Sequence, residues 1–242
     1  MSLIIGQKLV SATGGTITNI SGYTIHTFTS SGTFTPSQNG TVEALVVGAG
    51  GSSFNTGAVG GSGGGSVIYK KFIPVGAGVS YSIEIGQIVA PISTASTFTH
   101  PQGPITAPGG GGGGNAPGSP GVSNPVGSGG GGATPAGAAG VGAGITGFGF
   151  SGGAATPSWS GSGGGAGGEG KLGFPASHGG IGVSYSITGV SSYYGSGGGG
   201  GSGNPNNNIS LPQVSIYGRG GKTPEPSPYP AGPGVVIIRY IS

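Results

Sequence analysis

Glycine constrains this chain more than any other residue type. The chain holds 64 glycines in 242 residues, whereas an ordinary domain holds about 7%. They gather in runs such as 109–114, 129–132, 163–165 and 197–201. Glycine loses much conformational entropy on folding and has no side chain to bury. The middle of the chain is therefore either disordered or packed through its backbone in a way that only glycine permits.

Charge and cysteine content exclude several classes of protein. The chain has 7 Lys and Arg, 4 Glu and no Asp, and its net charge of +3 is scattered. It therefore lacks the basic cluster that nucleic-acid binding requires. With no Cys it has neither disulfides nor thiolate metal sites. Disordered segments usually combine low hydrophobicity with high net charge, and this chain does not.

Targeting and membrane segments are not predicted either. No apolar stretch approaches the length that spans a membrane. The first residues lack the basic start and apolar core of a signal peptide. We therefore expect a protein that does not insert into membranes and does not use the usual secretion route.

Alternating side chains predict β-strands near both ends of the chain. No segment shows helical periodicity with capping residues. The expected strands are 23–29, 32–36, 41–47, 66–73, 79–85 and 234–241. We expect a mainly β fold with no α-helix, in which residues 21–86 and 234–242 form a small β-sandwich closed by the C-terminal strand. Residues 1–20 would then be an N-terminal attachment or oligomerisation segment.

Several glycine runs repeat with a period of three. In residues 195–203 the only other side chains, Ser196 and Ser202, fall in the same column. Three residues per turn is the period of polyproline II, which rises about 3.1 Å per residue without internal hydrogen bonds. Because buried backbone groups must be paired, such helices would bond to one another and leave no room for inward Cβ atoms. We expect residues 87–233 to form an inserted slab of polyglycine-II helices, and a flexible linker is the alternative.

Sequence motifs that suggest nucleotide, phosphate or metal binding lack the flanking residues that such sites require. Residues 45–53 resemble a dinucleotide-binding turn, but neither a helix nor an acidic residue about 20 positions on follows. Residues 219–223 resemble part of a phosphate loop but run into a proline-rich segment. His26, His100 and His178 show no metal-ligand spacing, and His26 fits a structural role within a strand. We expect no catalytic residues, no metal and no cofactor, and hence no enzyme.

Aromatic, Ser-rich and Asn-rich inserts separate the glycine runs. Loops on a rigid scaffold commonly carry recognition, and these residue types form adaptable binding surfaces. If the runs are rods, the inserts gather at the two ends of the slab. For any one aromatic, packing against glycine or against the sandwich is the alternative. The candidate binding residues are Phe148, Phe150, Trp159, Phe174, His178, Tyr193, Tyr194, Asn207, Tyr217, Arg219 and Tyr229.

Both ends of the chain resemble a known family. Residues 26–36 and 42–51, with residues 232–240, resemble the glycine-rich domain of bacteriophage tail fibres and tail-tip adhesins. Residues 185–190 and 194–201 match the style of its middle part. The chain is also similar in logic to the distal adhesins of T-even-like phages, whose polyglycine-II slab presents variable loops. Their N-terminal fibre-attachment domain has no obvious counterpart.

The resemblance implies a receptor-binding protein at the tip of a tail fibre. It would bind a surface protein or polysaccharide of the host bacterium through the insert loops, and its other partner would be the tail fibre protein of the same virion. The implied location is the distal tail fibre, after synthesis in the host cytoplasm. A structural glycine-rich coat protein and an ice-binding protein are the alternatives.

Overall fold

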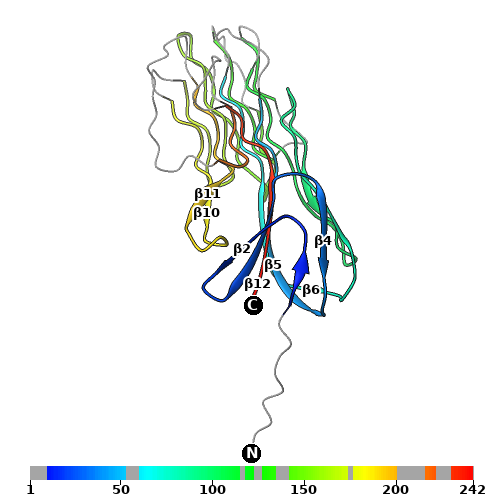
Figure 1. The fold of residues 1–242 in the computed structure, drawn as a ribbon. Coiled ribbons are helices and arrows are strands. Elements are labelled where there is room, and N and C mark those ends of the chain that lie inside the picture. Colours follow the sequence, from blue (N-terminus) through cyan, green and yellow to red (C-terminus); the bar gives the residue numbers. More distant parts are fainter. Residues whose placement is uncertain are drawn as a thin grey trace, which may run out of the picture.

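The computed structural model describes residues 10–52, 60–114, 118–122, 127–134, 142–173, 177–200, 216–221 and 230–241. These residues form β-strands in three antiparallel sheets and no helix, so they include no helical membrane span. The predicted mainly β fold without α-helix is confirmed. Figure 1 shows the two large sheets in one half of the molecule and the glycine-rich segments in the other.

Two five-stranded sheets form the sandwich. Sheet I has the strand order β2 (Thr16–Ile20), β3 (Tyr23–Phe28), β12 (Val235–Ile241), β5 (Gly40–Val47) and β6 (Val67–Val75). Sheet II has the order β1 (Ala12–Thr13), β4 (Gly32–Pro36), β7 (Tyr81–Glu84), β8 (Ser96–Phe98) and β9 (Ile105–Ala107). The C-terminal strand β12 pairs with both β3 and β5. It is therefore the central strand of sheet I and completes the sandwich, as predicted.

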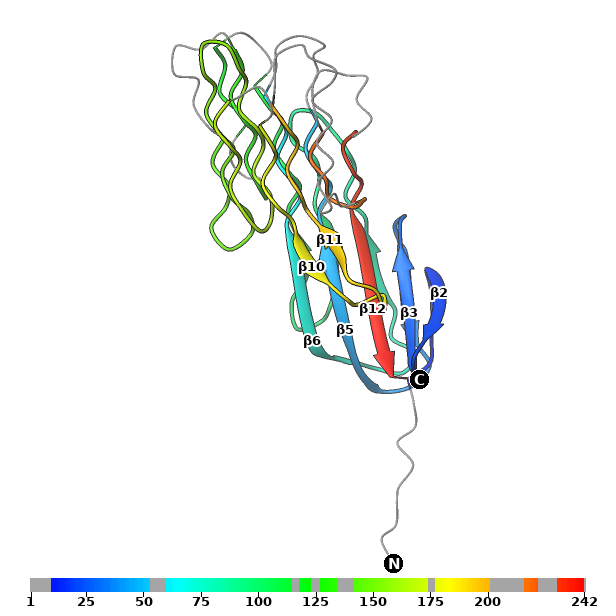
Figure 2. The ribbon, with the colours of Figure 1, turned by 90° about the vertical axis from the view of Figure 1, so that its left-hand side faces the viewer.

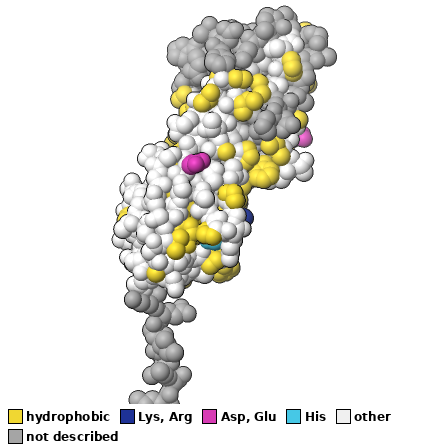
Figure 3. All heavy atoms as spheres, turned by 90° about the vertical axis from the view of Figure 1, so that its right-hand side faces the viewer, with side chains coloured by type: hydrophobic (Ala, Val, Ile, Leu, Met, Phe, Trp, Pro, Cys, Tyr) yellow, Lys and Arg dark blue, Asp and Glu magenta, His cyan; other side chains and the backbone are white. Residues whose placement is uncertain are grey.

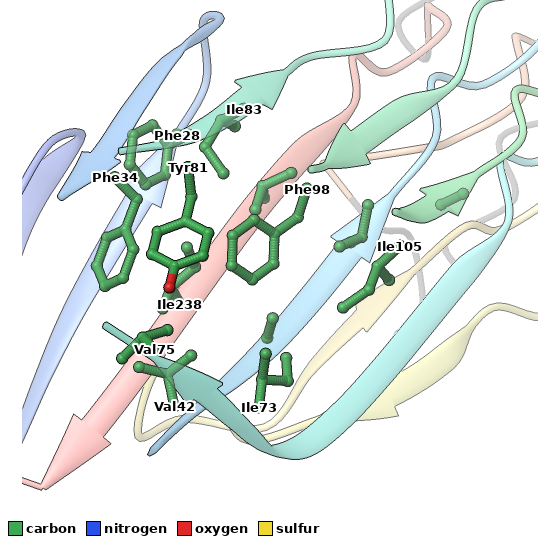
Figure 4. Packing of buried hydrophobic residues seen from close by; sticks show 14 of the residues in the cluster. Phe28, Phe34, Val42, Ile73, Val75, Tyr81, Ile83, Phe98, Ile105 and Ile238 are labelled. Carbon is green, nitrogen blue, oxygen red and sulfur yellow. The ribbon is translucent and has the colours of Figure 1, made fainter. Parts of the chain in front are cut away.

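The main core lies between the two sheets. Alternate residues of facing strands point inward, and rings from β4, β7 and β8 meet there (Figure 4). The ring of Tyr81 lies 5.8 Å from that of Phe98 and 6.4 Å from that of Phe34, centroid to centroid. His26 is fully buried beside them. Its Nδ1 donates to the carbonyl of Gly14 at 2.6 Å, so its Nε2 accepts from the Tyr240 hydroxyl at 3.0 Å.

A second core covers the other face of sheet I. The hairpin of β10 (Val183–Tyr185) and β11 (Ser192–Tyr194) lies across that face (Figure 2). Ile187 and Tyr194 pack there against Leu45 and Ile237. Both faces of β5 are therefore buried, which its alternating apolar side chains predicted.

The sheets draw on more of the chain than expected. Strands β1 and β2 fall within residues 1–20, and β8 and β9 fall within residues 87–233. Strands β8 and β9 have three residues each, too few for alternation to reveal them from sequence. The division of the chain into three domains stays a prediction.

Candidate functional site

The run 60–66 shows how the glycine-rich segments pack. It leads directly into β6, and its N–H groups donate to different neighbours in turn, at N–O distances of 2.7–3.2 Å. Every third residue donates to the same neighbour. Residues 60, 63 and 66 donate to the run 108–114, residues 61 and 64 to the run 161–164, and residues 62 and 65 to the run 218–221.

The carbonyl groups of the same run face three further neighbours. They accept hydrogen bonds from residues 128 and 131, from residue 198, and from residues 48 and 51. The run is thus surrounded by six other segments and bonds to each of them through backbone atoms. The Ser62 hydroxyl adds one side-chain bond, which it accepts from the Gly113 N–H at 3.3 Å. A period of three with bonding on all sides is what the polyglycine-II prediction required.

Glycine is needed because neighbouring backbones approach too closely for a side chain. An added Cβ at Gly63 would overlap the carbonyl oxygen of Ser128, and one at Gly129 would overlap that of Gly142. The same holds at Gly163, where the carbonyl oxygen of Ser62 lies in the way. The interior of the slab therefore holds only small side chains, such as the buried serines Ser62, Ser128 and Ser162, and the larger side chains lie in turns and connections.

The end of the slab remote from the sheets carries two of the predicted binding residues. In the run 60–66, residue 66 adjoins β6, so residue 60 lies at the end of the slab that is remote from the sheets. Gly161 donates to Gly132 and accepts from Gly61 near that end, and the turn before it carries Trp159. This turn is closed by the Thr156 N–H, which donates to the Trp159 carbonyl at 2.8 Å. Trp159 is half-buried, and His178 is exposed on a neighbouring segment.

The end of the slab nearest the sheets carries Phe148 and Phe150. The Ile145 N–H donates to the Gly127 carbonyl at 3.0 Å, which places the turn 145–149 beside the start of β6. Here a hollow of about 470 Å³ is lined by Val67, Thr146, Phe148, Phe150, Ser151, Ala166 and Glu169, with glycines between them. We call it the Phe150 hollow; the Phe150 side chain is 43% exposed. The structure therefore places these two candidates together, at the opposite end of the slab from Trp159.

Three of the four remaining described candidates, Tyr194, Tyr217 and Arg219, make contacts within the fold. Tyr194 is only 3% exposed and belongs to the second core, and Tyr217 packs against it. Tyr193, its neighbour on β11, is half-buried. Arg219 donates two hydrogen bonds to the Pro230 carbonyl, at 2.7 and 2.9 Å. Placing Tyr194 in a recognition loop was wrong, because its strand folds back onto sheet I. Phe174, Asn207 and Tyr229 lie outside the described residues.

A charged cluster that the sequence did not reveal fixes the hairpin. Arg239 pairs with Glu43, its cross-strand partner, at 2.5 Å, and also donates to the carbonyls of Ser186 and Ile187. Burial alone would raise the pKa of Glu43, but hydrogen bonds from Tyr69 and Arg239 outweigh it and lower that pKa. Burial and Glu43 together raise the pKa of Tyr69 to about 12. The cluster is structural, since all its partners lie within the sheet and hairpin.

No metal site emerges from the described part of the chain. Nowhere in it do three His, Cys, Asp or Glu side chains come together in a way that could hold an ion. His26 and His100 instead bond to backbone carbonyls, those of Gly14 and Pro74. The structural role predicted for His26 agrees with this placement.

Comparison with known proteins agrees with the composition. A family model described as a glycine-rich domain matches residues 29–241. This match takes in both large sheets and the slab, apart from β1 to β3. A search of the curated proteins finds no relative of the chain.

Proposed function

The chain belongs to the glycine-rich domain family, and we propose that it is a receptor-binding adhesin at the tip of a bacteriophage tail fibre. Its ligand would be a surface protein or polysaccharide of the host bacterium. The observation that carries this proposal is the backbone-bonded slab. Its interior is held mainly by backbone hydrogen bonds, with a few more from buried serine hydroxyls, so the turns at its ends can change in sequence without disturbing the packing.

The far end of the slab is the part we assign to the receptor. It carries the half-buried ring of Trp159 and the exposed imidazole of His178. Tryptophan is enriched among the residues that dominate binding energy at interfaces. The resemblance of both chain ends to the glycine-rich domain of tail fibres supports the proposal that the protein is an adhesin. The second partner would be the tail fibre protein of the same virion, and the location the distal fibre after synthesis in the host cytoplasm.

Binding of the labelled protein to a panel of bacterial strains tests the proposal. We expect saturable binding to some strains only, and loss of binding after protease treatment of the cells if the receptor is a protein. Trp159→Ala is expected to weaken binding at least tenfold, while Val190→Ala, at an exposed residue between β10 and β11, is the control. If no strain binds, or if both variants lower binding equally, the assignment to the far end is wrong.

One observation favours ice binding as a second candidate. Most outward side chains of sheet II are small hydroxyls, the Glu84 carboxylate beside Thr97 being an exception, and Thr33, Ser82, Thr97 and Thr106 stand in cross-strand pairs. The Thr97 and Thr106 hydroxyls lie 3.2 Å apart, and such pairs recur at a strand spacing of about 4.8 Å. Figure 3, which looks onto this side, shows few charged side chains. Thermal hysteresis of the purified protein, lost in Thr97→Lys, would support this candidate, and its absence would remove it.

A further inference from the structure

Phe72 is the most unusual side chain on the surface of the sandwich. It is 79% exposed and its φ is +55°, a left-handed conformation that bulky residues rarely adopt. It lies where the register between β5 and β6 shifts, between Val42 and Ala44. A bulge of this kind re-aims a side chain, and backbone strain of this kind clusters at functional sites. An exposed aromatic held in a strained conformation points to a contact that buries it.

The strand that carries Phe72 is the edge of sheet I. Among the described strands β6 pairs with β5 alone, so its other side offers N–H and C=O groups that no second strand pairs. The Pro74 carbonyl of β6 is already bonded to His100. Lys70 and Lys71 beside Phe72 are exposed, and neither forms an ion pair within the described residues. The Lys71 ammonium lies 5.5 Å from the centre of the Tyr69 ring. The surface is thus an apolar knob next to two cations.

The Phe150 hollow has the complementary character. It offers two phenylalanine rings and one carboxylate, that of Glu169. It is also lined by Val67, which starts the same strand β6. The knob and the hollow therefore lie along one edge, five residues apart in sequence.

We propose that two copies of the chain associate along β6 about a two-fold axis, with Phe72 of each copy seated in the Phe150 hollow of the other. The two β6 edges would pair antiparallel, with Phe72 of the first copy opposite Val67 of the second. Because two-fold contacts are reciprocal, Phe72 of the second copy then lies opposite Val67 of the first. Lys70 and Lys71 then lie near Glu169 of the other copy. This leaves the far end of the slab uncovered, so the proposal does not depend on the adhesin function.

Sedimentation of the purified protein over a concentration series tests the dimer. We expect the mass to rise from the 22.6 kDa of one chain toward twice that value. Phe72→Gly removes the ring and suits the left-handed φ, so it is expected to shift the midpoint of association at least tenfold without lowering Tm. Val190→Ala, on another exposed apolar residue (69% exposed), is the control and should associate as the wild type does.

Charge reversal separates this dimer from other modes of association. Glu169→Lys is expected to weaken association, and adding Lys70→Glu and Lys71→Glu to it should restore it. A wild-type mass of one chain at every concentration would overturn the proposal. So would a dimer that both Phe72→Gly and Glu169→Lys leave intact.

Discussion

Replacing Gly63 with alanine tests whether the glycine runs are packed as tightly as the structure shows. The new Cβ would overlap the carbonyl oxygen of Ser128 and lie 2.6 Å from the carbonyl carbon of that residue. Ordinary contacts of a Cβ begin at 3.4 Å, so the runs 60–66 and 127–132 must separate by at least about 0.8 Å to clear that carbon, and by more to clear the oxygen. Neither run can turn a flexible side chain out of the way, because the obstacle is backbone.

The cost follows from the two hydrogen bonds that join these runs. The Gly131 N–H donates to the Gly61 carbonyl at 2.8 Å, and the Ser128 N–H donates to the Gly64 carbonyl at 3.1 Å. A separation of about 0.8 Å takes both beyond hydrogen-bonding distance. Each buried N–H left unpaired costs about 1–3 kcal/mol, so the two donors alone cost about 2–6 kcal/mol. For a chain of this length that lowers Tm by roughly 4–24 °C.

Gly221→Ala is the matched control within the same slab. Its added Cβ would meet nothing closer than 3.4 Å, and its φ is not left-handed. Alanine also reduces the conformational entropy of the unfolded chain, which stabilises by about 0.4–1 kcal/mol. Thermal unfolding followed by circular dichroism should therefore show Gly63→Ala melting well below wild type and Gly221→Ala melting at or slightly above it. Equal melting of the two variants would refute close packing of the runs.

Three further predictions concern the sandwich and its hairpin. Burial lowers the pKa of His26, although its hydrogen bond to the Gly14 carbonyl acts in the opposite direction. Protonation of His26 therefore favours the unfolded chain, so Tm should fall as the pH drops below about 6.5. The variant His26→Gln should show a weaker dependence of Tm on pH between pH 7 and 5. Arg239→Met removes the ion-pair partner of Glu43, which keeps only its hydrogen bond from Tyr69, and frees the hairpin. We therefore expect a loss of about 1–3 kcal/mol and faster amide exchange over residues 183–194. Tyr194→Ala empties the second core and should cost about 3–5 kcal/mol in denaturant unfolding, whereas the neighbouring Tyr193→Ala should cost far less.

The periodicities of the sequence predicted much of the fold. Alternation over residues 41–47 predicted a strand buried on both faces, and β5 has a core on each side. The period of three in the glycine runs predicted helices bonded to one another, and the run 60–66 has such bonds on six sides. Both patterns work because a strand repeats every two residues and this helix every three, so local sequence alone selects the geometry.

Periodicity could not predict whether an individual aromatic side chain is buried or exposed. Tyr194 and Phe150 both adjoin glycine-rich stretches, yet Tyr194 is buried against sheet I and Phe150 is 43% exposed beside a hollow. The difference depends on where each segment turns, which is set by contacts distant in sequence. The pair of Arg239 and Glu43, 196 residues apart, was hidden for the same reason. Phe72 gave no signal either, because an aromatic in a β-prone run predicts a strand residue and not a bulge.

The slab and the sandwich depend on each other for a physical reason. Ordering one residue of backbone costs about 1–2 kcal/mol, and glycine loses the most freedom. A backbone hydrogen bond contributes a net of about 0.5–1.5 kcal/mol, so a slab held by such bonds alone is marginal at best. Its segments are continuous with sheet strands: 48–52 follow β5, 60–66 precede β6 and 108–114 follow β9. The two apolar cores fix those strands side by side, and the glycine segments leave the sheets already aligned. The hydrophobic stability of the sandwich is therefore what allows a slab without a hydrophobic core to be ordered.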